Sequence, residues 1–139
     1  MIILDTNVIS EMSRSTAHAG LIAWASQRSE DELYLCAPVI AELYFGAQRF
    51  VYRNNSRILL DKVTALVNKS FQNRILPFDE SSAKIAGEMR AYRESIGRPV
   101  FPVDMSIAGI CRSHNATLAT RNIRDFEGLD LKLVNPFEG

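Results

Sequence analysis

Short apolar runs alternate along this chain with longer segments in which apolar residues recur every three or four positions. The apolar runs have the length of strands buried in a parallel sheet, and they occupy residues 1–4, 33–37, 74–78, 117–120 and 131–134. The periodic segments predict helices over residues 6–12, 18–28, 38–49, 53–73, 80–96 and 103–114. Strands that alternate with helices in this way predict an α/β fold with a mostly parallel five-stranded sheet.

One aspartate, one glycine and two prolines mark the boundaries around the predicted helix over residues 80–96. Asp79 is a good N-cap for this helix, and Gly97 suits its end. Pro99 and Pro102 disfavour helical backbone at the residue before each of them. We therefore expect an extended connection before the next helix.

Length and composition are those of one globular domain. A chain of 139 residues can bury a sizeable core but is short for two ordinary domains, and it contains no internal repeat or linker. Apolar residues make up 47% and charged residues 23%, as in soluble proteins. The 16 basic and 16 acidic residues balance, so a nucleic-acid partner would have to be held by a local patch of positive charge.

The cysteines and the N-terminus favour a cytoplasmic protein. Cys36 and Cys111 lie in apolar segments without the spacing of a metal site or redox motif, so we expect buried, reduced thiols. The apolar run at residues 1–4 has no basic segment before it and is far too short to cross a membrane.

Three carboxylates lie in segments that are otherwise apolar. Asp5 follows the first predicted strand and is the only charged residue among the first ten. Glu42 is the only charged residue within 33–48, and Asp104 is the only one within 99–111. Burying an unpaired carboxylate is costly, so each of these acids must be protonated, paired or bound to a cation.

A plain structural role stays open for two of these acids. Asp5 could be only the N-cap of the helix after it, and Asp104 could cap the helix over residues 103–114. Glu42 lies in the middle of a predicted helix, where it cannot cap, so it must be paired or lie at a rim. Each acid falls at a strand end or on a helix that follows a strand, where open α/β sheets place their ligands. One shared crevice therefore accounts for all three.

A shared crevice of this kind predicts a metal site. Oxygen ligands without a His or Cys cluster favour Mg²⁺ or Mn²⁺ over zinc, and Mg²⁺ is usually held by one or two carboxylates with water and substrate phosphate. Such a site can activate water and offset the charge that builds up on a phosphodiester. The residues expected to orient the carboxylates are Thr6, Asn7 and Thr120.

Several segments resemble PIN-domain ribonucleases, in particular the VapC-like toxins of bacterial toxin–antitoxin pairs and their FitB branch. The matching segments keep the family's order and are LDTNVISE, AELYFGAQR, GRPVFPVDMSIAGI, and LATRNIRDFEGL followed by LVNPFE. The resemblance implies a Rossmann-like three-layer α/β/α sandwich and an endoribonuclease that depends on Mg²⁺ or Mn²⁺. It also implies a homodimer, and inhibition by a small VapB-like antitoxin inserted across the active-site groove.

The resemblance also assigns roles to individual residues. Asp5, Glu42 and Asp104 match the family's three principal acids, with Asp5 and Asp104 holding the ion. Glu42 would act through water or help to deprotonate the nucleophile. The fourth position, often Asp, is Asn122 here, which can hydrogen-bond a metal water or the substrate but adds no charge. Asp125 could supply the missing carboxylate, or it could be an exposed cap of the next turn.

Three arginines flank the predicted site in sequence and are candidate contacts to RNA phosphates: Arg98, Arg121 and Arg124. Ordinary surface solvation is the alternative for each of them.

Two other functional classes compete with the nuclease. Aspartyl-phosphate phosphohydrolases also begin with an apolar strand that ends in Asp, but they need a second acid two residues later, where this chain has Asn7. A catalytically weak module could instead work through its antitoxin, with operator DNA bound by the antitoxin alone. Asn122 favours that alternative, and the three retained acids argue against it.

Overall fold

A five-stranded parallel sheet forms the centre of the structure, a computed structural model that describes residues 1–138. Its strands are β1 (Ile2–Leu4), β2 (Leu33–Cys36), β3 (Ile75–Leu76), β4 (Thr117–Ala119) and β5 (Lys132–Val134). They lie in the order β3-β2-β1-β4-β5, and each neighbouring pair is parallel. The predicted α/β fold with a five-stranded sheet is therefore confirmed, and this sheet is parallel throughout.

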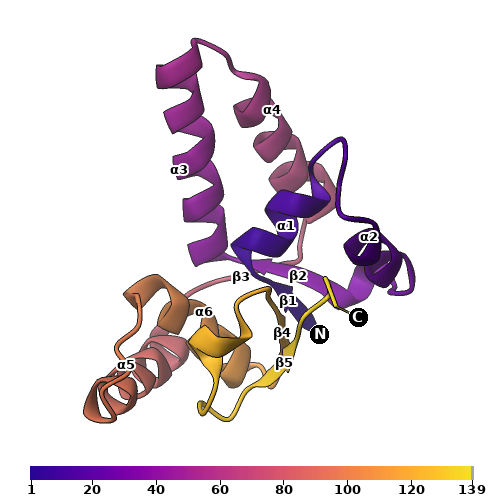
Figure 1. Cartoon of the computed structure of the whole chain (residues 1–139). Coiled ribbons are helices and arrows are strands. Elements are labelled where there is room, and N and C mark those ends of the chain that lie inside the picture. The colour runs from indigo at the N-terminus through magenta and orange to yellow at the C-terminus, as the bar shows by residue number, and fades with distance from the viewer. Residues whose placement is uncertain (139) are drawn as a thin grey trace.

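Helices cover both faces of this sheet. The helices are α1 (Thr6–Met12), α2 (Ala19–Ser26), α3 (Ala37–Asn54), α4 (Ile58–Ala65), α5 (Glu80–Ser95) and α6 (Pro102–Ser113). In Figure 1, α1, α3 and α4 lie above the sheet, and α5 and α6 lie below it. The expected three-layer α/β/α arrangement is confirmed. Three shorter turns complete the order: η1 (Glu30–Glu32), the π-helical η2 (Leu66–Ser70) and η3 (Ile123–Phe126).

The core lies between the sheet and these two helical layers. Ile3 and Leu4 of β1, the central strand, are fully buried, as is Leu118 of β4. On the lower face, α5 and α6 approach each other closely at Gly109, where a Cβ would lie 2.4 Å from the carbonyl oxygen of Ser82. A side chain at this position would force the two helices apart, so glycine is required there.

The third and fourth helices differ from the sequence-based prediction. The helix expected over residues 38–49 continues to Asn54, and the helix expected over 53–73 contains only α4 and η2. The break falls at Asn55, whose backbone is left-handed with a φ of 50° and ends α3. Asparagine tolerates this conformation better than most residues, and the apolar periodicity on either side concealed it. The resulting α3–α4 hairpin projects from the sheet (Figure 1).

The boundaries around α5 agree with the prediction. Asp79 caps the helix, with its side chain accepting a hydrogen bond from the N–H of Ser82, and Gly97 follows the helix with a φ of 71°. The next helix begins one residue earlier than expected, at Pro102. Among the described residues, no helix combines the length and the apolar character needed to cross a membrane.

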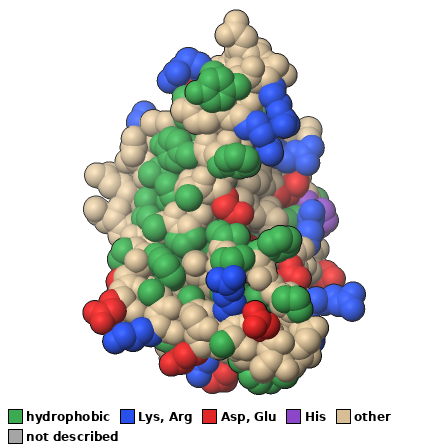
Figure 2. Space-filling view, turned by 90° about the vertical axis from the view of Figure 1, so that its left-hand side faces the viewer, with side chains coloured by type: hydrophobic (Ala, Val, Ile, Leu, Met, Phe, Trp, Pro, Cys, Tyr) green, Lys and Arg blue, Asp and Glu red, His purple; other side chains and the backbone are tan. Residues whose placement is uncertain are grey.

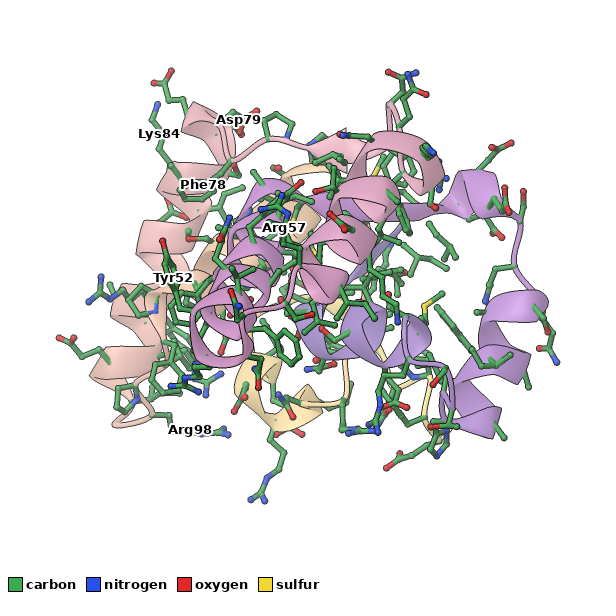
Figure 3. All side chains as sticks on the ribbon, turned by 90° about the horizontal axis from the view of Figure 1, so that it is seen from above. Tyr52, Arg57, Phe78, Asp79, Lys84 and Arg98 are labelled. Atoms are coloured by element: carbon green, nitrogen blue, oxygen red, sulfur yellow. The ribbon has the colours of Figure 1, made fainter. Side chains whose placement is uncertain are left out.

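Hydrophobic side chains remain on the surface along α3 and α5. Figure 2 shows them gathered in the middle of the face that these two helices share, with lysines and arginines mostly nearer its edges. Tyr52 of α3 and Phe78, just before α5, extend toward this side of the molecule (Figure 3), and both are exposed.

Candidate active site

The site begins where the direction of the strand order changes. From β1 the chain builds the sheet toward β2 and β3, and later returns to β4 on the other side. Open α/β sheets bind ligands outside the carboxyl ends of the strands at such a point. Asp5 directly follows β1, and its N–H donates to the carbonyl of Ala119, the last residue of β4. The predicted strand-end position of Asp5 is therefore found at the switch point.

Three donors hold the buried Asp5 carboxylate. The N–H of Thr6 and the hydroxyl of Thr120 each donate to it at 2.8 Å, and the Asn7 amide donates at 3.3 Å. The side chain is 4% exposed and caps α1, so the capping alternative is correct as geometry. Capping accounts for only one of the three hydrogen bonds.

Burial raises the pKa of Asp5 above its usual value, and the negative charge of Glu42 adds to this effect. The donors Thr120, Thr6 and Asn7 lower the pKa without cancelling the rise. A carboxylate with a raised pKa and neutral donors gains stability from a nearby cation.

Glu42 lies in the middle of α3, half-buried, where it cannot cap a helix. Its carboxylate accepts a hydrogen bond from the hydroxyl of Thr6 at 2.5 Å. Thr6 therefore contacts two acids, donating its N–H to Asp5 and its hydroxyl to Glu42. The expected orienting role of Thr6 falls on both carboxylates.

Asp104 lies in the first turn of α6, but it does not cap that helix. The N-cap position belongs to Phe101, so the capping alternative for Asp104 is wrong: the helix begins before the expected residue. No described residue donates a hydrogen bond to the Asp104 carboxylate. Burial, followed in order of size by the negative charges of Asp5, Asp125 and Glu42, raises the pKa of Asp104 to about 6. The acids predicted to share a crevice thus lie within electrostatic range of one another.

The donor set suits an ion held by two carboxylates. Over residues 1–138, no group of three or more His, Cys, Asp or Glu side chains is placed to bind one metal ion. The ion pairs found among the described residues involve other acids, namely Glu11, Glu80, Glu127 and Asp130. Asp5 and Asp104, whose pKa values are raised, therefore have no basic partner in an ion pair. Mg²⁺ fits such a pair, because it usually keeps several waters and takes one or two carboxylates.

Asn122 and Asp125, the two candidates for the family's fourth acidic position, lie at different places in the site. The N–H of Asn122 donates to the Thr120 hydroxyl at 3.0 Å, which ties Asn122 to the hydrogen bonds around Asp5. Its side chain is exposed. Asp125 lies in η3, is also exposed, and lines a pocket together with Asp104. The two residues therefore flank different carboxylates.

The three arginines predicted near the site are all exposed. Arg121 stacks over the ring of Phe137 at 3.7 Å, and its N–H donates to the Asn7 side chain at 3.1 Å. Arg98 extends at the edge of the molecule (Figure 3) and lies 4.0 Å from Glu127. Arg124 is on η3. Each remains available to a ligand in solution.

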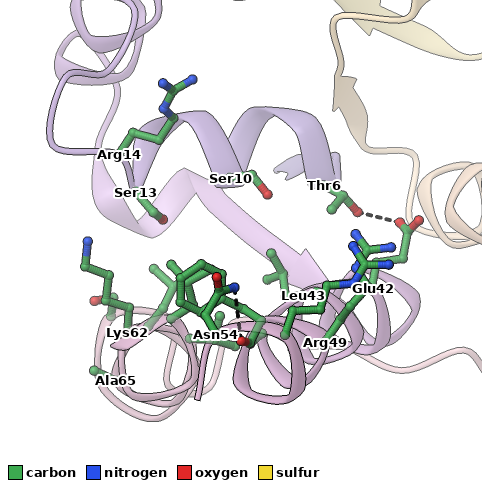
Figure 4. Close-up of a pocket in the computed structure, with 18 residues that line it drawn as sticks. Thr6, Ser10, Ser13, Arg14, Glu42, Leu43, Arg49, Asn54, Lys62 and Ala65 are labelled. Carbon is green, nitrogen blue, oxygen red and sulfur yellow. Dashed lines mark hydrogen bonds between the residues drawn. The ribbon is translucent and has the colours of Figure 1, made fainter. Parts of the chain in front are cut away.

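A cleft of about 810 Å³ lies between α1, α3 and α4, with Thr6 and Glu42 on its wall (Figure 4). Its floor is largely apolar and includes Leu43, Phe50 and Val63. Its basic side chains are Arg14, Arg49, Arg53 and Lys62. The cleft thus joins an apolar, basic surface to the acidic site.

Sequence reasoning missed Arg93, a buried residue of α5. Its side chain is 3% exposed and donates to the carbonyls of Arg98, Asp125 and Glu127. Nothing in the sequence distinguishes it from the other charged residues of this helix, because its partners are backbone carbonyls and two of them lie more than thirty residues away.

Comparison with known proteins identifies the family of the chain. Residues 2–131 match the PIN domain family. Toxin FitB of Neisseria gonorrhoeae is 34% identical over 137 residues, and VapC ribonuclease Y4jK of Sinorhizobium fredii is 31% identical over 138 residues. Each alignment covers 99% of this chain and 99% of the relative.

A solved structure of FitAB bound to a DNA fragment superposes with a TM-score of 0.88 at 33% identity, covering 99% of this chain and 96% of that one. The chain therefore belongs to the PIN domain family. Within that family it is similar to the FitB and VapC toxins.

Proposed function

We propose that this protein is the toxin of a type II toxin–antitoxin system, a cytoplasmic endoribonuclease that depends on Mg²⁺ or Mn²⁺. The observation that carries the proposal is a pair of carboxylates without a basic partner: Asp5 at the sheet's switch point, and Asp104 in the first turn of α6, whose pKa is raised in part by the charge of Asp5. Similarity over nearly the whole chain to a relative named as a ribonuclease supports the choice of RNA as substrate.

In the proposed reaction, Asp5 and Asp104 hold the cation. When bound, such a cation would supply Lewis-acid activation and charge neutralisation at the phosphodiester. Thr120 and Asn7 fix the orientation of the Asp5 carboxylate through their hydrogen bonds. Glu42, held by the Thr6 hydroxyl, takes up the proton that the attacking water loses or hydrogen-bonds water beside the ion.

The remaining site residues are assigned to the substrate. The Asn122 amide hydrogen-bonds water or RNA next to the metal position. Arg98, Arg121 and Arg124 are proposed phosphate contacts, because guanidinium groups bind phosphate oxygens in a bidentate manner. All four side chains are exposed and adjoin the acids in sequence or in space.

The cleft between α1, α3 and α4 is the proposed seat of a VapB-like antitoxin. Its apolar floor suits the apolar side chains of a bound segment, and its four basic residues suit acidic ones. A segment lying there would reach Glu42 and block access to the acids. We further propose a homodimer that buries exposed apolar side chains of α3 and α5 (Figure 2).

The test is RNA cleavage by Asp5→Asn and Asp104→Asn variants in Mg²⁺ and Mn²⁺, with cut sites mapped on total cellular RNA. Cleavage should fall more than about 100-fold in both, because even outer residues of metal sites are worth about 10- to 100-fold. Asp61→Asn, an exposed acid of α4, is the matched control and should cleave normally. Full activity in a folded Asp5→Asn or Asp104→Asn variant would refute the mechanism.

A second function is favoured by Asn122 and by the DNA-bound FitAB complex. In that alternative the module is catalytically weak and acts with its antitoxin as a DNA-binding autoregulatory complex, with operator DNA contacted by the antitoxin. Calorimetric titration with Mn²⁺ separates the two functions. Binding by the wild type that is lost in Asp5→Asn supports the nuclease, whereas no binding by either supports the alternative.

A further inference from the structure

A second, smaller pocket lies beside Asp104, away from the α3–α4 cleft. Its volume is about 320 Å³, and its walls are Pro99, Val100, Phe101, Asp104 and Asp125. The pocket thus combines an aromatic ring and two aliphatic side chains with two carboxylates. One of these carboxylates is a proposed metal ligand, so anything bound in the pocket adjoins the reacting phosphate.

Buried hydrogen bonds fix the walls of this pocket. The Arg93 side chain donates to the carbonyl of Arg98 at 3.1 Å, which holds the loop leading to Phe101. The same guanidinium donates to the carbonyls of Asp125 at 2.9 Å and Glu127 at 3.3 Å, which holds η3. Arg93 therefore joins the two walls from below.

Two prolines also restrict the backbone on the Phe101 side. Pro99 and Pro102 fix φ and flank the aromatic residue. The pocket is accordingly preorganised and loses little conformational freedom when a ligand enters.

Phe101 is exposed to an unusual degree for an aromatic residue. It is 76% exposed although it follows two pocket residues and precedes the buried part of α6. An exposed aromatic ring beside a nuclease site offers a stacking surface for a base, which is worth about 5- to 150-fold in affinity per base. Single-stranded RNA is read in this way, by stacking and by hydrogen bonds to base edges.

Asp125 adds a chemical preference. An ionised carboxylate only accepts hydrogen bonds, so it favours bases with an exocyclic amino group, as when Asp or Glu accepts from cytosine N4. Cytosine, adenine and guanine carry such a group, and uracil does not.

We propose that the pocket of Phe101 and Asp125 binds the RNA base next to the scissile phosphate, with the base stacked on Phe101 and its amino group donating to Asp125. This assignment rests on the proposed ribonuclease function. Phe101 and Asp125 are then the residues that set the base preference around the cut.

The first test measures binding without cleavage. A short RNA that contains 2-aminopurine, a fluorescent base with an amino group, is titrated with protein in EDTA. Wild type and Phe101→Trp should quench its fluorescence, whereas Phe101→Ala should bind about 10-fold more weakly and quench little. Ile22→Ala removes an exposed apolar side chain of α2, which lies outside both the site and the proposed dimer surface, and should behave as wild type. Unchanged quenching and affinity in Phe101→Ala would overturn the proposal.

The second test measures base choice at the cut. A randomised RNA pool is cleaved in Mn²⁺, and the bases next to each cut are counted. Asp125→Asn should lose about 10-fold of the preference for amino-bearing bases over uracil, because the amide lacks the charge that strengthens the bond and its NH2 group can donate to uracil. Cleavage by the wild type with identical base choice in Asp125→Asn and Phe101→Ala would refute this site and leave the nuclease intact. Quenching of the 2-aminopurine RNA without any cleavage by the wild type would support the base site and refute the proposed nuclease function.

A second copy of the chain is the competing occupant. Light scattering of wild type and Phe101→Ala decides this point. An unchanged oligomeric state agrees with the base site, whereas dissociation of the variant would assign Phe101 to a contact between copies and overturn the proposal.

Discussion

The two proposed metal ligands lie in opposite surroundings. Asp5 is almost fully buried and accepts hydrogen bonds from Thr6, Asn7 and Thr120. Asp104 is only partly buried, and no described residue donates to it. Burial raises the pKa of both, but only Asp5 has donors that offset the rise. The Asp5 half of the site thus has hydrogen-bond donors from the protein, and the Asp104 half has none among the described residues.

This difference indicates that the two carboxylates have different roles in the proposed site. The Asp5 half uses backbone and side-chain groups at the ends of β1 and β4, which the sheet holds rigidly. The Asp104 half faces a pocket with an exposed aromatic ring and a further acid. Groups left without partners at a site are satisfied by what binds there, which under the proposed function is a cation and RNA. The Asp5 half therefore fixes position, and the Asp104 half receives the ligand.

The largest effect that would sharpen this comparison is expected from Thr120→Val. The buried Thr120 hydroxyl donates to Asp5 and accepts from the N–H of Asn122, so valine removes both interactions at nearly constant shape. Mn²⁺ affinity should fall about 10- to 100-fold, as for other groups that orient a metal ligand. Calorimetry measures the affinity, and cleavage rates should follow it.

Thr120→Ser is the matched control for that measurement. Serine keeps the hydroxyl, so Mn²⁺ affinity should remain within a few-fold of the wild type. An equal loss in Thr120→Ser would show that the methyl packing of Thr120 matters and the hydrogen bond does not. The orientation of Asp5 would then depend on Thr6 and Asn7 and not on the Thr120 hydroxyl.

A smaller effect is expected on stability in the Asp104 half. The pKa of Asp104 is about 6 in the folded protein and about 3.9 in an unfolded chain, so between these pH values the folded state binds more protons. Stability without metal must then fall as pH rises through this range. Asp104→Asn removes the penalty and should be more stable than the wild type at pH 7, by about 1 to 2 kcal/mol after solvent screening, and equal to it near pH 4.

Urea unfolding in EDTA at pH 4, 5, 6 and 7 measures this difference. Adding Mn²⁺ at pH 7 should stabilise the wild type by mass action, by about 2.7 kcal/mol at one hundred times the dissociation constant, and should leave Asp104→Asn nearly unchanged. If Asp104→Asn is destabilised at all four pH values, Asp104 has structural partners in the folded protein and the contrast with Asp5 is lost.

The sequence predicted the parts of the molecule that chain topology determines. Alternating strands and helices fix the sheet and place Asp5 at a strand end. The three isolated acids are close enough for Asp5 and Glu42 to affect the pKa of Asp104, but Glu42 and Asp104 line different pockets. Contacts that depend on helix rotation and loop path were not predictable. Thr6 contacts Glu42 as well as Asp5, and Arg93 binds carbonyls more than thirty residues away. The left-handed turn at Asn55 was missed because its neighbours have helical periodicity on both sides.

The smallest effect on stability and Mn²⁺ affinity is expected from a substitution at Asn122, which lies between the Asp5 and Asp104 halves of the site. Its N–H belongs to the Asp5 half through Thr120, and its exposed side chain is not hydrogen-bonded to any described residue. Asn122→Ala keeps the N–H, so stability should stay within about 0.5 kcal/mol and Mn²⁺ affinity within about two-fold.

Cleavage kinetics then decide what the Asn122 side chain does. A lower kcat for Asn122→Ala with unchanged Mn²⁺ affinity would mean that the amide acts on the reacting groups, because an interaction made only in the transition state lowers kcat and leaves ground-state binding alone. A loss of Mn²⁺ affinity comparable to that of Thr120→Val would instead place Asn122 among the groups that fix the ion. The Asp5 half would then extend beyond the sheet ends into η3, and the division between a rigid half and a receiving half would have to be redrawn.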